Sequence, residues 1–162
     1  MTYYEVIQNA LQMFYEKYKY CYFYGAKGQK MTEETMNSLI SAEPAYFSKY
    51  TTQELAEIKN YSRGKIGMDC SGFVSAVLSQ SNYSTGYFNA SNVHTIPKNG
   101  KEGSGLYTTF SNTGRHIGID IGYGYFLHCP KEMHTIELGK ISDYSWEDSF
   151  EFEGIAYEGA KS

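Results

Sequence analysis

Apolar side chains in the first part of the chain recur with the period of an α-helix. From residue 3 to residue 19 they are spaced three or four positions apart, which predicts an amphipathic helix. Residues 22–25 are aromatic and end in glycine, so we expect a turn there. Two short helices are predicted over residues 32–41 and 52–60, each beginning near a threonine, and the first is broken near Pro44.

After residue 104 the apolar positions change to a period of two, which is typical of strands. Before this change we expect a loop at 64–67, a helix from Cys70 to about residue 80, and a long polar loop over 81–104. Because helices precede an antiparallel sheet, the predicted fold class is α+β, with N-terminal helices packed on a C-terminal sheet. Strands are predicted over residues 106–110, 116–121, 124–128, 133–138 and 150–157.

Length and composition favour a simple architecture. The chain has 162 residues, enough for one sizeable core, so we expect residues 1–162 to form a single domain. The formal net charge is -4, whereas surfaces that bind nucleic acid need a basic field. No apolar run approaches the roughly 18 residues that span a bilayer. We therefore expect neither nucleic acid nor a membrane as a partner.

The segment Asp69-Cys70-Ser71-Gly72 stands where the chain enters a predicted helix. Asp69 is a good N-cap residue, which places Cys70 in the first helical turn. There the unpaired backbone N–H groups and the helix dipole favour an anion, so we expect a lowered thiol pKa and a nucleophilic thiolate. The same N–H groups would stabilise the oxyanion of a tetrahedral intermediate. The alternative is a buried structural cysteine, which is common.

Two histidines lie on neighbouring predicted strands. His116 opens one strand, with small Gly118 on the same face, and a rigidly held imidazole suits a general base. His128 follows the hairpin centred on Tyr123, which makes it a near neighbour of His116 across the two strands. One imidazole would then orient the other, as the third member of a triad does. The alternative for His116 is a half-buried histidine with satisfied hydrogen bonds.

These pieces together resemble the NlpC family of papain-like cell-wall peptidases. The matching segments occur in the right order and cover most of the chain: YFYGA at 22–26, DCSGFV at 69–74, RHIGIDIG at 115–122 and YFLH at 125–128. The resemblance implies a papain-like fold and a cysteine endopeptidase that hydrolyses peptidoglycan stem peptides, often between D-glutamate and the diamino acid.

The resemblance also implies a role for each matching residue. Cys70 would be the nucleophile, His116 the base and His128 the polar residue that orients the base. Three further residues would hold the substrate peptide or support the oxyanion site, namely Tyr22, Asp69 and Ser71.

The chain departs from the family pattern in two places. The family usually has Gly-Asp-Leu on the strand before the histidine, where this chain has Gly105-Leu106-Tyr107. The stretch 27–66, between the aromatic turn and the nucleophile, is unusually long, and we expect it to form a helical insertion or flap near the cleft. Both differences bear on which bond is cut rather than on the catalytic class.

No cofactor is expected. A zinc site built from Cys70, His116, His128 and Cys129 is conceivable, but the chain has neither the C-x-x-C nor the H-x-x-x-H spacing typical of such sites. Free thiols are expected, because three cysteines cannot all pair and no signal peptide is recognisable.

Four other side chains have simpler interpretations. We expect His94 and His134 to lie at the surface, Asp120 to be solvated, and Trp146 to pack in the core.

The resemblance suggests a peptidoglycan peptide as substrate and a monomeric enzyme. Without a recognisable signal peptide, the chain would stay cytosolic until released, as a phage lysin does, or would be an excised domain of a secreted wall enzyme. Two alternatives remain open at this point. One is a papain-like amidase, isopeptidase or acyltransferase that acts on a non-wall acyl substrate. The other is a binding module whose thiol site is degenerate.

Overall fold

The computed structural model describes residues 1–78, 94–96, 101–110 and 114–161. The helices are α1 (Tyr3–Tyr15), α2 (Glu33–Ala42), α3 (Pro44–Phe47), α4 (Thr52–Ser62) and α5 (Cys70–Val77), with short 3-10 turns η1 (Lys17–Lys19) and η3 (Ile141–Asp143). The strands are β1 (Tyr20–Tyr22), β2 (Lys27–Lys30), β3 (Ile66–Met68), β4 (His94–Ile96), β5 (Gly105–Phe110), β6 (Gly114–Gly122), β7 (Tyr125–His128), β8 (Glu137–Lys140) and β9 (Asp148–Glu151). Among the described residues, no helix is long and apolar enough to cross a membrane.

The helices of the first half form where the periodicity predicts them, and threonines cap them. The hydroxyl of Thr32 accepts a hydrogen bond from the backbone of α2. Thr51 forms a capping box with Glu54 at the start of α4, which satisfies two otherwise unpaired N–H groups. Pro44 does not only end a helix but also begins α3, because its fixed φ suits the first helical position.

Six strands form an antiparallel sheet in the order β4-β9-β5-β6-β7-β8. The predicted strands at 106–110, 116–121 and 124–128 correspond to β5, β6 and β7. Two others are misplaced: β8 begins at Glu137 rather than 133, and β9 covers Asp148–Glu151 rather than 150–157. Alternating apolar residues in these tails contact the core from irregular segments, so periodicity alone overextended the strands. Most of the predicted 81–104 loop lies outside the described residues.

A second, smaller sheet was not predicted and has the order β1-β3-β2. Residues 64–67 were expected to be a loop, which is wrong for Ile66 and Gly67, because they belong to the middle strand β3. This strand pairs in parallel with β1 and antiparallel with β2. Tyr22 lies opposite Met68, and Lys27 also pairs with Met68. Because Met68 is followed by Asp69 and Cys70, this sheet brings two distant segments to the start of α5.

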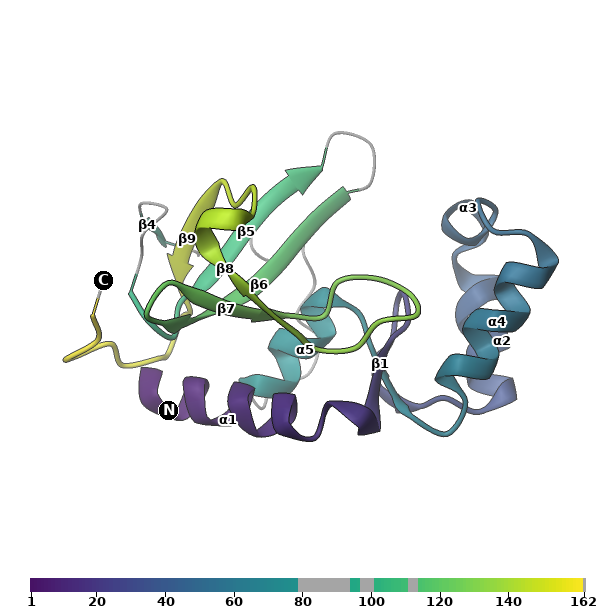
Figure 1. The fold of residues 1–162 in the computed structure, drawn as a ribbon, viewed down its shortest axis with the longest axis horizontal. Coiled ribbons are helices and arrows are strands. Elements are labelled where there is room, and N and C mark those ends of the chain that lie inside the picture. The colour runs from purple at the N-terminus through teal and green to yellow at the C-terminus, as the bar shows by residue number, and fades with distance from the viewer. Residues whose placement is uncertain (79–93, 97–100, 111–113, 162) are drawn as a thin grey trace.

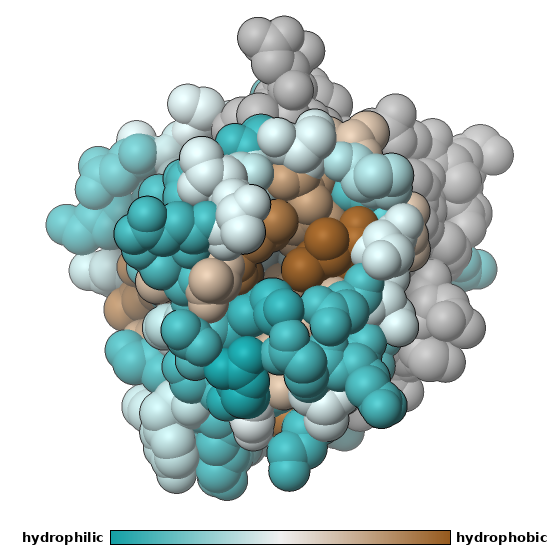
Figure 2. Space-filling view, turned by 90° about the vertical axis from the view of Figure 1, so that its right-hand side faces the viewer, coloured by the Kyte–Doolittle hydropathy of each residue, from teal (hydrophilic) through white to brown (hydrophobic). Residues whose placement is uncertain are grey.

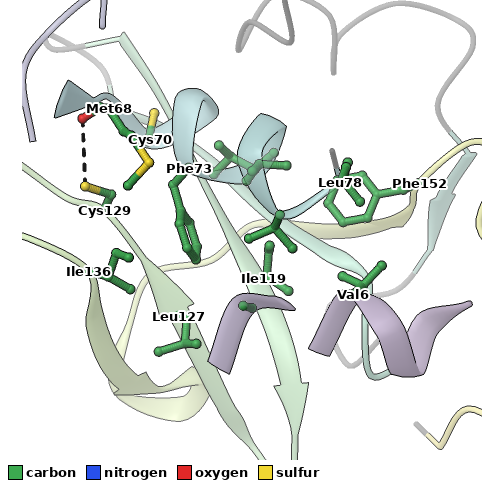
Figure 3. Close-up of a cluster of buried hydrophobic side chains, with 14 of the residues drawn as sticks. Val6, Met68, Cys70, Phe73, Leu78, Ile119, Leu127, Cys129, Ile136 and Phe152 are labelled. Carbon is green, nitrogen blue, oxygen red and sulfur yellow. Dashed lines mark hydrogen bonds between the residues drawn. The ribbon is translucent and has the colours of Figure 1, made fainter. Parts of the chain in front are cut away.

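The largest buried cluster lies between α1, α5 and one face of the six-stranded sheet (Figure 3). Phe73 of α5 packs there with Ile119 of β6 and Leu127 of β7, and all three side chains are fully buried. Burying each such side chain contributes about 1.5–3 kcal/mol to folding. Cys70 lies at one end of this cluster, beside Met68 and Cys129 (Figure 3). The core therefore positions α5 and the thiol at its first turn.

A second cluster joins the three helices of the 27–66 segment to β1. Figure 1 shows α2, α3 and α4 together at the end of the molecule opposite the C-terminal strands. Met36, Phe47 and Ile58 pack there against Cys21 and Phe23. On this side of the molecule, apolar residues line a hollow with a hydrophilic rim (Figure 2). The 27–66 stretch, expected to be a helical insertion, is helical over most of its length and has its own small core.

Candidate active site

Cys70 is the first residue of α5, and Asp69 caps the helix. The Asp69 Oδ1 atom accepts a hydrogen bond of 2.7 Å from the backbone N–H of Gly72, and the Asp69 carbonyl accepts one from Phe73. Backbone hydrogen bonds from Ile117 of β6 and from Ser71 reach the Cys70 thiol. The thiol thus lies against β6, one residue from His116.

The expectation of a lowered thiol pKa is wrong for the structure as it stands. Burial raises the pKa of Cys70 to about 12, and the negative charge of Asp69 adds to this effect. The backbone hydrogen bonds and the ammonium of Lys27 act in the opposite direction but are weaker. Desolvation outweighs the helix dipole here because Cys70 is only 7% exposed. The Cys70 thiol is therefore neutral in this structure.

His116 and His128 form a direct contact. The Nε2 atom of His116 lies 2.7 Å from the Nδ1 atom of His128, and both side chains are buried. The β6–β7 register pairs Ile119 with Leu127, so the two histidines are diagonal rather than directly opposite neighbours. The sequence prediction that the hairpin brings them together is confirmed, because aromatic side chains reach across a diagonal pair.

An aromatic side chain stacks on one face of the His116 ring. Trp146 is buried, as predicted, and its ring stacks on His116 at 5.5 Å with an interplanar angle of 13°. Gly118 leaves room for this ring, since a Cβ there would lie 3.1 Å from the indole. The stacking holds the imidazole plane, which an accurate general base requires.

Asp120 lies on the same face of β6 as His116 and Gly118. We expected it to be solvated, but it is buried. Its Oδ1 atom accepts a 2.8 Å hydrogen bond from the backbone N–H of Gly122. Burial raises the pKa of its carboxyl group to about 6. Its bond helps to shape the tight turn after β6, where Gly122 and Tyr123 have positive φ values.

Burial keeps both histidines neutral near pH 7. It lowers the pKa of His116 to about 4 and that of His128 to about 3, the latter also through the charge of His116. In a neutral pair one ring donates the shared proton and the other accepts it. If His116 donates from Nε2, its Nδ1 is left as an acceptor, which is the protonation state of a base.

The three residues expected to contact substrate lie close to Cys70, and each already interacts with other parts of the protein. Tyr22 is buried, and burial raises the pKa of its phenol with a further contribution from Cys70. Asp69 and Ser71 flank the thiol, and both contact the ammonium of Lys27, at 2.5 and 2.6 Å. Their role in substrate binding stays a prediction.

Lys27 is a residue of this site that sequence reasoning missed. No motif or periodicity connects it with Cys70, because 42 positions separate it from Asp69. Only the unpredicted pairing of β2 with β3 brings the two together.

A hollow of about 320 Å³ adjoins the histidine pair. His134, expected at the surface and on a strand, is partly exposed and lies in the irregular segment before β8, where its Nδ1 atom is 3.1 Å from a carboxylate oxygen of Glu137. The side chain of His94 lies outside the described part. The hollow is lined by His116, His128, Pro130, Lys131, His134, Glu137 and Tyr144. Most of the residues around the space beside His128 therefore carry ionisable side chains.

The remaining cysteines are buried thiols. Cys129 donates to the carbonyl of Met68 at 3.8 Å, and Cys21 donates to that of Ser62 at 4.0 Å. None of the three cysteines, all of them among the described residues, forms a disulfide. Within the described ranges, no three histidine, cysteine, aspartate or glutamate side chains converge as a metal site would require.

Comparison with known proteins decides the family. The sequence model of the NlpC/P60 family matches residues 51–152, a segment that contains Cys70, His116 and His128. The chain belongs to the NlpC/P60 family. This membership makes it a hydrolase of a cysteine peptidase family. The matched segment begins after α3, so α1 and most of the insertion lie outside it.

A solved structure supports the same assignment at the level of the fold. The NlpC/p60 domain of the peptidoglycan hydrolase SagA superposes with a TM-score of 0.56 at 17% sequence identity. The match covers 94% of this chain and 100% of that domain. A search of curated proteins gave no match. The prediction of a papain-like α+β fold is thus confirmed.

Proposed function

We propose that this NlpC/P60 protein is a cysteine endopeptidase that hydrolyses peptide bonds of peptidoglycan. Cys70 is the nucleophile, His116 the base and His128 the residue that orients the base. The observation that carries the proposal is the 2.7 Å contact between His116 Nε2 and His128 Nδ1. His116 lies on β6 next to Ile117, whose backbone bonds to the Cys70 thiol. The similarity to a domain of a peptidoglycan hydrolase supports the substrate class.

The reaction begins from a neutral thiol and a neutral imidazole. His116 takes the thiol proton on Nδ1, while its Nε2–H stays bonded to His128. The sulfur forms a bond to the scissile carbonyl carbon, whose oxygen becomes an oxyanion. Proton transfer creates the thiolate and the imidazolium together, so each charge has the other as a partner in a site that disfavours isolated charges.

Breakdown of the intermediate returns the proton. His116 protonates the leaving amine, the carbon–nitrogen bond breaks, and an acyl-enzyme thioester remains on Cys70. Water then attacks the thioester carbonyl and gives a proton to His116, which passes it to the departing thiolate. The products are a carboxylic acid and an amine, and the enzyme returns to its neutral state.

Two of the backbone N–H groups expected to stabilise the oxyanion are already paired. The N–H of Gly72 donates to the Asp69 carboxylate and that of Phe73 to the Asp69 carbonyl. Other donors must therefore hold the oxyanion.

We propose the bond between D-glutamate and the diamino acid as the one cleaved, by analogy with the family. The helical insertion, which lies mostly outside the matched segment, is the part of this chain that would adapt the cleft to its own stem peptide.

The test is release of muropeptides from purified cell walls of several bacteria, followed by mass analysis of the fragments. We expect the protein to release fragments with a new amine on the diamino acid. We expect Cys70→Ala, which has no nucleophile, to lose at least about 100-fold of this activity. A Cys21→Ala variant is the matched control, because Cys21 is also a buried free thiol but packs in the other core.

Wall digestion that survives in the Cys70→Ala variant would overturn the assignment of the nucleophile. If walls stay intact but Cys70 is acylated by another amide or ester substrate, the same site serves as an amidase, isopeptidase or acyltransferase. That result would contradict the proposed substrate class and leave the thiol mechanism in place.

A further inference from the structure

Lys27 places a positive charge directly beside the proposed nucleophile. Its Nζ atom lies 2.5 Å from Asp69 Oδ1 and 2.6 Å from Ser71 Oγ, the residues on either side of Cys70. The Ser71 hydroxyl also bonds to Asp69 Oδ1 at 3.2 Å, which closes a ring of three polar side chains. The Lys27 side chain is 30% exposed and that of Asp69 is 13% exposed, so solvent screens this ion pair only in part.

The backbone holds Lys27 in this position. The carbonyl of Ala26, the preceding residue, accepts a 3.0 Å hydrogen bond from the N–H of Asp69. The same carbonyl would lie 2.7 Å from a Cβ at Gly72, so only glycine permits this close approach of β2 to α5. Lys27 itself pairs with Met68 of β3. The ammonium is therefore fixed at the first turn of α5 by the fold and not by a flexible surface chain alone.

The charges around the thiol oppose its ionisation unless one of them is compensated. Burial and the carboxylate of Asp69 both raise the pKa of Cys70, whereas the charge of Lys27 lowers it. The titratable groups that interact electrostatically with Cys70 are Lys27 of β2, Asp69 before α5, Tyr22 of β1, Tyr24 after β1, Cys129 after β7 and Tyr144 after η3. On β6, His116 adjoins Ile117, whose backbone bonds to the thiol. Of the groups in this set, Lys27 carries the permanent positive charge at neutral pH.

We propose that Lys27 is a positioning residue for the nucleophile, which neutralises Asp69 and holds Asp69 and Ser71 so that the Cys70 thiolate can form. The inference rests on the proposed role of Cys70. It explains why an N-cap carboxylate, which repels a neighbouring thiolate, is tolerated next to the reacting sulfur. Asp69 can cap α5 without opposing catalysis because Lys27 offsets its charge.

The experiment measures the rate constant for alkylation of Cys70 by iodoacetamide at about pH 8, well below the pKa of the buried thiol, where the rate follows the small thiolate fraction. Peptide mass spectrometry separates Cys70 from Cys21 and Cys129. In Lys27→Met we expect this rate constant to fall about threefold to tenfold, because a nearby cation that favoured the thiolate is lost. In Lys27→Arg, which keeps the charge, we expect a rate constant closer to that of the wild type. The exposed Lys30 of the same strand supplies the matched control, Lys30→Met, with an unchanged rate constant.

A second variant tests the opposite sign. Asp69→Asn keeps a good N-cap residue but removes the negative charge, so the rate constant for Cys70 should rise. Circular dichroism identifies variants that do not fold. Should Lys27→Met be one of them, Lys27→Gln retains a hydrogen-bonding group without the charge and must show the same fall in rate. An unchanged rate constant in the folded neutral variant, or an equal fall in Lys30→Met, overturns the proposal.

Alkylation needs no peptidoglycan, so the two proposals fail separately. Intact cell walls together with the expected changes in alkylation rate would contradict the proposed substrate and preserve the role of Lys27. Normal wall digestion with no change in the alkylation rate of Lys27→Met would do the reverse.

Discussion

At the scale of single residues, burial rather than residue type decides the protonation states of this site. Sequence motifs correctly point to Cys70, His116 and His128 as neighbours in the fold. They also suggest a thiolate stabilised by a helix dipole, yet desolvation raises the thiol pKa and lowers the pKa of both imidazoles. The neutral pair and the thiolate–imidazolium pair contain the same number of protons. The pH range of activity is therefore set by the acidic pH at which this pair gains a proton and the basic pH at which it loses one.

The acid limb of the pH–rate profile should lie below the ordinary histidine range. His116 stays neutral until the pH falls toward about 4, so it can still accept the thiol proton at pH 5 to 6. We expect a bell-shaped kcat/KM profile whose acid midpoint lies below the unperturbed value of about 6.5. The measurement is peptide hydrolysis from pH 3.5 to 10, with near-UV circular dichroism at each pH to separate titration from unfolding. An acid midpoint at or above 6.5 in the folded protein would contradict the burial argument.

At the scale of elements, the helical insertion is attached to the catalytic half through a buried carboxylate. Tyr46 of α3 and Tyr50 after it donate their hydroxyls to Glu132, at 2.5 and 2.8 Å. The Tyr46 ring also stacks on Tyr24, at 3.6 Å and 10°. Glu132 belongs to the segment that precedes β8, and its neighbours Lys131 and His134 border the hollow beside His128. The insertion is thus joined to a wall of the candidate cleft and is held as more than a loose flap.

Removing this attachment should destabilise the protein. Tyr46→Phe and Tyr50→Phe each delete a hydrogen bond to the buried Glu132 carboxylate, so each should lower the free energy of unfolding by about 1–3 kcal/mol. Tyr15→Phe serves as the control, because Tyr15 is 72% exposed on α1 and should change stability by no more than about 0.5 kcal/mol. Urea unfolding followed by far-UV circular dichroism gives the values. Equal stabilities of Tyr46→Phe and Tyr15→Phe would show that the contact to Glu132 does not hold the insertion.

At the scale of the whole molecule, two apolar cores meet near α5, and the buried histidines lie on the far face of the main sheet. Ile117 and Ile119 of β6 face the first core, while His116 and Asp120 occupy the opposite face and are also buried. This arrangement keeps several ionisable groups out of water at once. It makes the stability of the fold depend on pH.

The protein should lose stability on acidification through a window set by its histidines. The folded-state pKa values of His116 and His128, about 4 and 3, lie below the unfolded value of 6.5, so the unfolded chain binds protons first. Their contribution is complete above pH 6.5 and is lost as the pH falls toward 4. Asp120 acts in the opposite sense, because its raised pKa favours the folded state at lower pH, but it is one group against two.

Thermal unfolding between pH 7.5 and 4 tests this expectation. We expect Tm to fall across the window and to fall less steeply in His128→Asn, which removes one buried titrating group. His134→Asn is the matched control, since His134 is partly exposed and its loss should leave the slope as it is. A His128→Asn slope identical to that of the wild type would refute the assignment.

Local features of this protein could be read from spacing along the chain. Helix periodicity, threonine caps and the glycine-rich hairpin act over a few residues, so they predict α1, α2, α4 and the β6–β7 pair, and with it the contact of His116 with His128. The DCSG segment and the histidine strand likewise point to the family, which the match over residues 51–152 confirms. The ends of β8 and β9 escaped prediction because alternating apolar residues continue beyond the paired backbone.

Features that depend on distant segments could not be read in this way. The β1-β3-β2 sheet, the attachment of α3 to Glu132 and the contact of Lys27 with Asp69 join positions 36 or more residues apart. Spacing along the chain carries no trace of such pairs. The same holds for the neutral state of Cys70 and the histidines, because desolvation depends on every atom packed around a group. Sequence thus identified Cys70, His116 and His128 as candidates for the reacting side chains, whereas long-range packing set their charges and supplied the lysine beside them.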